Sequence, residues 1–484
     1  MGSQGDRQTV VIGTYERGVI MKRIETLKRL IILQLSFIGL LFHTAIYAYF
    51  WFEEYYPYLL YHGNAKFFFK GHVLIILIYF VLLFFFASTY GVLKIGYLKP
   101  TDVFISEFFS LLFANAISYF QISLMANWIV RIKPIMIAML IQTAFSIVWV
   151  FICNTCYYKA FPPRTILIIH GERSIDDIVS KFKSRKEKYK IGKSMNISEG
   201  IEAVKKEIMG EYGAVVLWDI PVADRNYLLK YCYSRSIRVY MMPKISDVLV
   251  KGADQLHLFD TPIYLTREYA LKVEQRIAKR LIDLICSILL LVIASPFMLI
   301  TAIAIKVYDG GPVFYKQIRC TVGRKEFYIL KFRSMKVDAE KDGVARLASK
   351  NDSRITPVGK FIRATRIDEL PQLLNILKGD MSFIGPRPER PEIIDQYLEE
   401  MPEFAFRMKV KAGLAGYAQV YGKYNTTPYD KLKLDLTYIE QYSVWLDLKL
   451  MLLTLKILIK PESTEGVDST QTTALKKEDG NREV

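Results

Sequence analysis

Four long apolar segments in the first third of the chain constrain its fold more than any other feature. They cover residues 30–52, 72–93, 103–128 and 135–156. Each is long enough to cross a bilayer as a helix, because about 20 apolar residues span the hydrocarbon core. The sequence therefore predicts a membrane protein with four transmembrane helices over residues 30–160.

Basic residues flank the first apolar segment and predict its orientation. Residues 1–29 end in Lys28 and Arg29, and by the positive-inside rule we expect this stretch in the cytoplasm. Four crossings return the chain to that side, so the soluble parts are expected to face the cytoplasm. No cleavable signal peptide is expected, because the first apolar run is too long and begins too late.

Composition narrows the class of partner. Hydrophobic residues make up 52% of the chain, and the formal charge is +17. An excess of positive charge favours binding to nucleic acid or to an anionic membrane surface. Because the basic residues cluster beside apolar segments, without an interleaved aromatic platform, we expect membrane contact and no nucleic-acid binding. The lone CxxC at Cys153 and Cys156 has no second pair for zinc, so the five cysteines are interpreted as reduced and structural.

Residues 161–268 change to short β-rich runs between charged helical stretches. TILIIH at 165–170, AVVLW at 214–218 and RVYMM at 238–242 predict a small parallel, Rossmann-like α/β domain. The first run is followed by HGERS, which has one glycine where a dinucleotide-binding turn needs three. We therefore expect a structural or regulatory role here and no bound nucleotide.

The apolar segment at 279–307 is interrupted by Ser295 and Pro296. A dense basic cluster follows it, and positive-inside logic keeps that cluster in the cytoplasm. The segment is therefore predicted to enter the membrane, break at Pro296 and return as a re-entrant helix, with Ser295 satisfying freed backbone groups. An ordinary spanning helix with a proline kink is the alternative.

Two adjacent carboxylates, Asp368 and Glu369, lie in the arginine-rich stretch RATRIDELPQLLNILKGDMSFIGPRPERP at 363–391. Pro371 predicts that a helix starts near the pair, and Gly379 predicts where it ends, with Leu370, Leu373, Leu374 and Leu377 on its apolar face. A helix N-terminus binds phosphate and keeps a nearby carboxylate ionised. The alternative is that Asp368 is only an N-cap residue.

Lysines at seven- and four-residue spacing mark the last apolar stretch. Lys449, Lys456 and Lys460 predict an interfacial helix at 445–460 whose lysines reach the headgroups, and a core helix is the alternative. The polar residues 461–484 predict a disordered tail.

A series of motifs in the last third resembles the bacterial sugar transferases, the monotopic phosphoglycosyl transferases that act on polyprenyl phosphate. The series is GPVFYKQIR from 311, KFRSM from 331, DSRITPVGKFIR from 352, DELPQLLNILKGDMSFIGPRP from 368 and AGLAGYAQVYGKY from 412. The resemblance implies an α/β monotopic catalytic domain at 269–460 with a re-entrant helix at 279–307. The four spans and the degenerate α/β domain look like the large, full-length members.

By this resemblance the chain transfers a sugar 1-phosphate from a UDP-sugar to undecaprenyl phosphate and releases UMP. The setting it implies is exopolysaccharide, capsule or O-antigen assembly at the bacterial inner membrane. Asp368 would be the nucleophile that carries the phosphosugar, and Glu369 with Asp368 would hold Mg²⁺. The residues expected to bind the donor phosphates are Arg363, Arg387, Lys331, Arg333 and Lys423. The sugar stays open between glucose, galactose and an N-acetylated hexose, and the long membrane domain is compatible with a homodimer.

The chain departs from the family pattern at several positions. Ala412 and Gly413 stand where Pro-Gly is usual, Cys320 and Thr321 where a hydrophobic residue and glycine are usual, and Lys423 where arginine is common. Lysine keeps the charge but loses a forked contact, which puts the ligand of Lys423 in doubt. A membrane-anchored nucleotide or lipid sensor is the alternative function, although it leaves the acidic pair unexplained. A processive inverting glycosyltransferase would need a DxD motif, which the sequence lacks.

Overall fold

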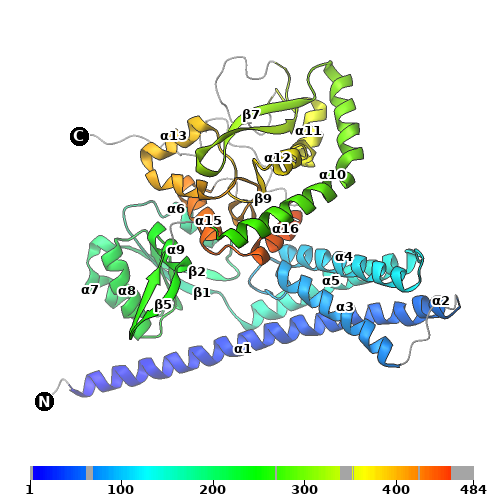
Figure 1. Cartoon of the computed structure of the whole chain (residues 1–484). Coiled ribbons are helices and arrows are strands. Elements are labelled where there is room, and N and C mark those ends of the chain that lie inside the picture. The colour runs from blue at the N-terminus through cyan, green and yellow to red at the C-terminus, as the bar shows by residue number, and fades with distance from the viewer. Residues whose placement is uncertain are drawn as a thin grey trace. The chain divides into compact units, whose positions relative to one another are not determined.

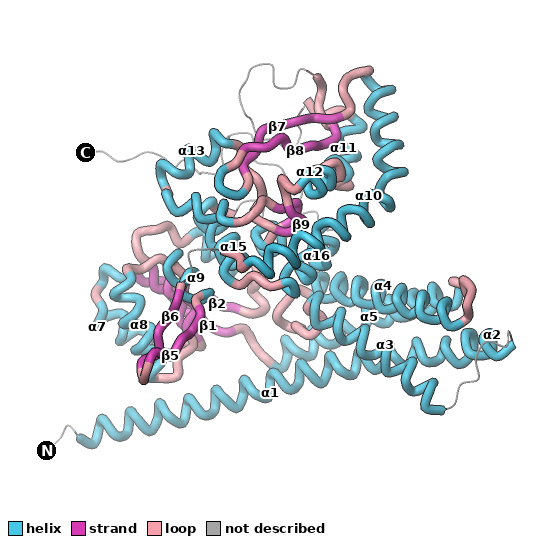
Figure 2. The backbone as a smooth tube through the Cα atoms, in the orientation of Figure 1, coloured by secondary structure: helices cyan, strands magenta, loops and turns pink. Residues whose placement is uncertain are grey.

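A computed structural model describes residues 4–61, 69–266, 270–337, 352, 354–422 and 426–458 (Figures 1 and 2). The chain forms two compact units, which divide after Met242. The five cysteines are free thiols.

Long helices build the first part of the N-terminal unit. They are α1 (Gln4–Phe50), α3 (Phe69–Tyr90), α4 (Pro100–Met125) and α5 (Lys133–Ala160), and a π-helical turn (Trp51–Tyr55) and the short α2 (Tyr56–Tyr61) extend α1. Helix α3 packs against α1 and α4, and α5 packs against α4 and α1. Within the described residues, five helices are long and apolar enough to span a membrane: these four and α10 of the second unit. The prediction of a membrane protein is thereby confirmed in outline.

Polar side chains connect the helices inside this bundle. Gln142 Nε2 donates to the hydroxyl of Tyr79 at 2.8 Å and to the carbonyl of His43 at 2.9 Å. Asn115 Nδ2 donates to Gln142 Oε1 at 2.8 Å, and His43 Nε2 lies 3.0 Å from Glu107 Oε1. In an apolar solvent, polar groups must find partners within the protein, so this network fits a bundle that lies in a membrane.

The rest of the N-terminal unit is the predicted parallel α/β domain. Its strands are β1 (Arg164–His170), β2 (Tyr189–Asn196), β3 (Ala214–Trp218) and β4 (Val239–Met241), and its helices are α6 (Asp176–Lys183), α7 (Ile201–Ile208) and α8 (Val222–Ser234). The sheet order is β2-β1-β3-β4, and every pair is parallel. Strand β2 escaped prediction because its sequence, YKIGKSMN, is polar and mostly not buried, as an edge position allows.

The second unit combines the long helix α10 with shorter helices and strands. They are α9 (Ile245–Gly252), β5 (Asp254–Leu258), β6 (Thr261–Leu265), α10 (Val273–Asp309), β7 (Phe314–Cys320), β8 (Glu326–Phe332), α11 (Pro357–Ala364), α12 (Gln372–Lys378), β9 (Ser382–Ile384), α13 (Pro391–Glu400), β10 (Gly413–Ala415), α14 (Tyr417–Tyr421), α15 (Pro428–Glu440) and α16 (Val444–Leu458), with 3-10 turns at Val322–Arg324, Ile367–Glu369 and Pro402–Lys409. The pairs β5–β6 and β7–β8 are antiparallel, and β9–β10 is parallel. The core gathers residues from β7, β8, α12, β9, α13, α15 and α16.

Helix α10 carries Pro296 inside it and stays one continuous helix. Figure 1 shows it change direction along its length. Ser295 Oγ donates to the carbonyl of Val292 at 2.8 Å, and this is the carbonyl that an N–H at position 296 would otherwise bond. Ser295 therefore satisfies the freed carbonyl, as predicted from the sequence. The predicted break into two helices is absent from α10, which changes direction but stays one helix. The re-entrant path through the membrane stays a prediction.

Helix α16 combines the two alternatives for the last apolar stretch. Its Asp447, Leu450, Leu453 and Lys456 are buried, as in a core helix, while Trp445, Leu448, Leu455 and Leu458 are exposed. The prediction that Lys456 extends outward to the headgroups is therefore wrong, because this side chain is buried. Lys460 and the predicted disordered tail at 461–484 lie outside the described residues.

Candidate active site

The acidic pair lies in a tight turn directly before α12. Arg366 has the left-handed φ of 59°, and Ile367–Glu369 then form a 3-10 turn. A bulky residue rarely adopts this conformation, so backbone strain is held next to the pair. Pro371 precedes the first residue of α12, and Gly379, with φ of 94°, ends the helix. The predicted end at Gly379 is therefore confirmed, whereas the helix begins at Gln372, later than the start predicted near Asp368, and Pro371 occupies the N-cap position.

The buried face of α12 differs from the predicted leucine face. Leu374 is exposed, whereas Asn375 is buried. Asn375 Nδ2 donates to the carbonyl of Tyr328 at 2.8 Å, and its Oδ1 accepts from the N–H of Leu330 at 2.9 Å. The amide thereby pairs with β8 as a neighbouring strand would. This contact holds β8, and with it Lys331, beside the acidic turn.

Two cations hold Glu369. Lys331 Nζ donates to Glu369 Oε1 at 3.0 Å, and an Arg387 Nη donates to the same oxygen at 3.2 Å. Burial opposes ionisation, but the neighbouring Lys331 and Arg387 hold the pKa of Glu369 well below its usual range. The charge of Glu369 in turn raises the pKa of Arg387. Glu369 is therefore a fixed anion.

Asp368 has the opposite environment. Its side chain is buried, with 9% exposed, and its Oδ1 has no hydrogen-bond partner among the described residues. Burial and the adjacent charge of Glu369 raise the pKa of Asp368 to about 6. A buried acceptor without a partner is costly and is typical of functional sites. The turn thus places one satisfied carboxylate beside one that is unsatisfied and more basic than usual.

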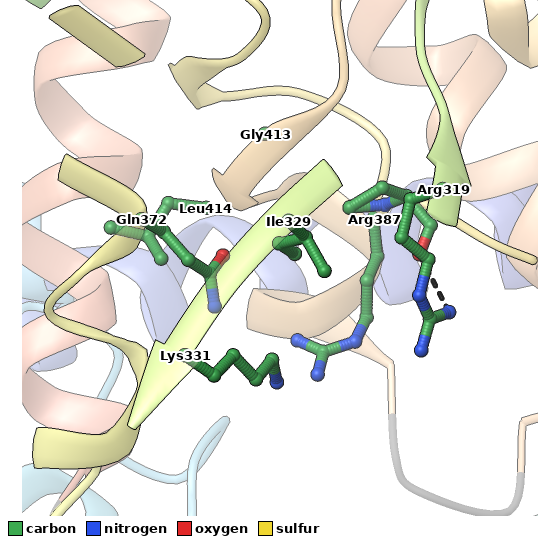
Figure 3. Close-up of a pocket in the computed structure, with 8 residues that line it drawn as sticks. Arg319, Ile329, Lys331, Gln372, Arg387, Gly413 and Leu414 are labelled. Atoms are coloured by element: carbon green, nitrogen blue, oxygen red, sulfur yellow. Dashed lines mark hydrogen bonds between the residues drawn. The ribbon is translucent and has the colours of Figure 1, made fainter. Parts of the chain in front are cut away.

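A small pocket lies beside the cations. Its lining is Arg319, Ile329, Lys331, Gln372, Arg387, Pro388, Gly413 and Leu414. In Figure 3 the charged ends of Lys331 and Arg387 point toward one another across it. Such convergent cations suit an anionic, phosphate-bearing ligand.

Arg319 was not singled out by sequence reasoning. One of its Nη atoms donates to the carbonyl of Pro388 at 3.1 Å, and the other donates to Gln317 Oε1 at 2.6 Å. The QIR motif at 317–319 was the available signal, because its glutamine orients its arginine.

The remaining predicted residues lie at different distances from this pocket. Arg363 belongs to α11, and its positive charge lowers the pKa of Asp368 against the two larger effects. Arg333 pairs instead with Asp309 at the end of α10 and is not among the lining residues. Its guanidinium covers Gly311, where a Cβ would collide with it. Lys423 lies outside the described residues. Donor binding by Arg363, Arg333 and Lys423 stays a prediction.

A metal ion at this site would have two protein carboxylates. No group of three or more His, Cys, Asp or Glu residues gathers within the described ranges. Mg²⁺ is commonly bound by one or two carboxylates together with substrate phosphates and water. The partnerless Oδ1 of Asp368 and the adjacent Glu369 fit that donor set.

Comparisons with known proteins identify the relatives of this chain. The sequence model of the family described as bacterial sugar transferase matches residues 274–461. The chain is 38% identical over 242 residues to a UDP-N-acetylgalactosamine-undecaprenyl-phosphate N-acetylgalactosaminephosphotransferase of Aeromonas hydrophila, covering 48% of this chain and 54% of that protein.

Two further relatives carry glucose in their names. A UDP-glucose:undecaprenyl-phosphate glucose-1-phosphate transferase of Escherichia coli K12 is 39% identical over 42% of this chain and 43% of its own length. The protein of the same name in Caulobacter vibrioides is 40% identical over 38% of this chain and 71% of its own length. The match thus spans about half the length of the first two relatives.

Proposed function

Because the chain belongs to the bacterial sugar transferase family, we propose that it transfers a sugar 1-phosphate from a UDP-sugar to undecaprenyl phosphate. Relatives named for this type of reaction support the proposal. Their names differ in the sugar, which is N-acetylgalactosamine, glucose or galactose. The sugar of this chain is therefore a question for experiment, and the product is the first lipid-linked intermediate of a surface glycan.

Asp368 is the proposed nucleophile. Its Oδ1 attacks the β-phosphorus of the donor, and the bond from that phosphorus to the bridging oxygen breaks. UMP leaves with the bridging oxygen and its electron pair, and Asp368 carries the phosphosugar as an acyl phosphate. A phosphate oxygen of undecaprenyl phosphate then attacks the same phosphorus, and the carboxylate of Asp368 is released. The observation that carries the proposal is the buried Oδ1 without a partner among the described residues.

The pKa of Asp368, near 6, suits this chemistry. At pH 7 to 8 the carboxylate is still mostly ionised, yet it is more basic than an exposed aspartate and hence a better nucleophile. Lys331 and Arg387, already fixed on Glu369, lie beside the pocket where donor phosphates would bind. Positive charge there offsets the negative charge that develops on the departing UMP.

Mg²⁺ is the proposed metal, with Glu369 and Asp368 as its protein ligands. When bound, it would supply further charge neutralisation on the diphosphate. The rest of the proposal depends on the residues of this chain.

The proposed setting is the bacterial inner membrane, with a multi-pass N-terminal unit, the soluble domains in the cytoplasm and α10 as a re-entrant helix. The change of direction along α10, which contains Pro296 (Figure 1), and the bond from Ser295 to the carbonyl of Val292 support this path. Single cysteines at Val273 and Val307, both exposed near the two ends of α10, test it in a cysteine-free chain. We expect labelling of both from the cytoplasmic side, and periplasmic labelling of Val307→Cys would contradict the re-entrant path.

The reaction itself is tested with donor alone. Purified full-length protein is mixed with each member of a UDP-sugar panel, without lipid acceptor, and UMP and intact protein mass are measured. We expect one donor to release about one equivalent of UMP and to add the mass of its phosphosugar. A sensor without catalysis would release no UMP. Release of UMP with an unmodified mass in a rapidly quenched sample would refute the covalent step.

A further inference from the structure

Basic residues line the side of the α/β sheet at which its parallel strands begin, and we call this side the basic edge. Arg164 opens β1, Lys188 immediately precedes β2, and Arg238 immediately precedes β4. These strands are parallel, so their first residues lie along the same edge. Backbone contacts confirm the alignment, because the N–H of Arg164 donates to the carbonyl of Lys188 at 3.0 Å and the N–H of Val215 to that of Arg238 at 2.9 Å.

This edge lies at one end of the helical bundle. Helix α5 ends at Ala160, directly before β1. Lys188 Nζ lies 3.4 Å from the ring centroid of Tyr97, in the connection between α3 and α4. Lys28, in α1 next to the first apolar segment, places its Nζ 5.0 Å from the ring centroid of Tyr157, in the last turn of α5. Aromatic and basic side chains gathered at the ends of apolar helices mark the level of lipid headgroups.

A further cation joins the edge. An Nη of Arg185 donates to the carbonyl of Tyr97 at 3.0 Å, and its Nε pairs with Glu187 at 2.5 Å. The five cations lie partly exposed, so a ligand can reach them; they are Lys28, Arg164, Arg185, Lys188 and Arg238. Burial, together with the positive charges of Arg185, Lys28, Arg164 and Arg238, lowers the pKa of Lys188 to about 8. The local field is therefore positive despite Glu187, and an anion there would relieve repulsion.

We propose that this basic edge, formed by Lys28, Arg164, Arg185, Lys188 and Arg238, binds the phosphate headgroup of an anionic membrane phospholipid. The lipid tails would lie along the apolar bundle, and the headgroup would connect the bundle end to the α/β domain. Basic pockets beside transmembrane helices bind such headgroups in this way. Its residues are distinct from those that line the pocket beside Glu369, and lipid binding there requires no catalysis.

The test uses the full-length protein in neutral detergent and counts bound lipid by native mass spectrometry. Dioleoyl phosphatidylglycerol is the anionic probe, and dioleoyl phosphatidylcholine is the neutral one. We expect the wild type to retain phosphatidylglycerol at concentrations where phosphatidylcholine does not bind. In Arg185→Gln/Lys188→Gln the affinity for phosphatidylglycerol should fall on the order of thirtyfold, because each basic residue near a membrane surface contributes to anionic-lipid attraction.

Two control variants isolate the site. Lys183→Gln/Lys206→Gln removes the same charge from exposed positions on α6 and α7 and should bind like the wild type. Arg185→Lys/Lys188→Arg keeps the charge and should retain most of the affinity, which separates charge loss from misfolding. Equal lipid retention in the Gln variant and the wild type would overturn the proposal. Displacement of phosphatidylglycerol by millimolar inorganic phosphate would also overturn it, because the edge would then be a site for soluble anions.

Discussion

The ammonium group of Lys331 lies 3.0 Å from Glu369 Oε1, although β8 and the acidic turn are far apart in the sequence. Asn375 makes this possible, because its amide bonds to β8 on either side of Ile329. Glu369 has a second cationic partner, because Arg387 donates to the same carboxylate oxygen. Glu369 is thus the point at which strand, turn and loop meet.

Replacement of Lys331 by Met is expected to lower kcat for UMP release about 100-fold, because one preorganised cation near the developing charge is removed. Arg387 still holds Glu369, so the protein should stay folded. Initial rates across donor concentrations and a thermal melt measure the two effects. Lys325→Met, at an exposed position just before β8, is the matched control. Equal rates in the two variants would remove Lys331 from the proposed charge clamp.

The acid limb of the pH profile should report Asp368. The ionised form is the nucleophile, so kcat/KM for the donor falls as pH drops through about 6, approaching tenfold per pH unit. Glu369→Gln removes the adjacent negative charge that raises the pKa of Asp368, and its acid limb should move to lower pH. Steady-state rates between pH 4.5 and 8 check this, after control for reversible unfolding. If the acid limb does not shift in Glu369→Gln, the limb reports a group other than Asp368.

Asp368→Asn should abolish adduct and turnover while it stabilises the fold at neutral pH. The pKa of Asp368 is raised above its unfolded value, so the ionised form destabilises the folded state above about pH 6. That cost fades as pH falls toward 4. Removing it should raise the free energy of unfolding by about 1–3 kcal/mol at pH 7.5. Thermal unfolding at pH 7.5 and at pH 4.5 tests the sign, and a destabilised variant at both would contradict it.

Local signals allowed the helix beside the acidic pair to be predicted from the sequence, because the backbone limits of Pro371 and Gly379 restrict where a helix begins and ends. The parallel α/β domain was also predictable, since β1 and β3 are continuous buried runs. Strand β2 was not, because an edge strand needs no such run.

Long-range contacts explain what the sequence could not provide at the site. Arg333 lies in a basic motif that favours a phosphate ligand, but its partner Asp309 comes from the end of α10, and no local pattern links them. Asn375 was not assigned to the predicted leucine face of this helix, and its β8 partners became visible only in the fold. The residues that orient the site are therefore those whose partners are distant in the chain.

Arg333→Ala is expected to act on stability more than on donor affinity. Arg333 is buried against Asp309, and its replacement removes this ion pair together with a buried guanidinium, so the free energy of unfolding should fall. Arg387→Ala, at the pocket, should instead raise KM for the donor. Denaturant unfolding and donor kinetics on both variants separate the two residues. A large KM change in Arg333→Ala with an unchanged unfolding free energy would return Arg333 to donor binding.

The buried pair of Lys279 and Asp447 should couple α10 to the loop that carries Arg387. Lys279 Nζ lies 2.7 Å from Asp447 Oδ2 and also donates to the carbonyl of Ile384 at 2.8 Å. Lys279→Met leaves Asp447 buried without its cation, so the expected loss of stability is about 3–5 kcal/mol. Lys279→Met/Asp447→Leu removes both charges and should recover most of it.

Activity need not recover with stability in that double variant. Ile384 stands three residues before Arg387, and without the Lys279 contact the loop that carries Arg387 loses an anchor. We therefore expect the double variant to melt near the wild-type temperature and yet to bind the donor more weakly. Thermal unfolding and KM for the donor, measured on one preparation, check this. If both the melting temperature and the KM for the donor return to wild-type values, Lys279 and Asp447 serve only to stabilise the fold, because Arg387 then keeps its position without Lys279.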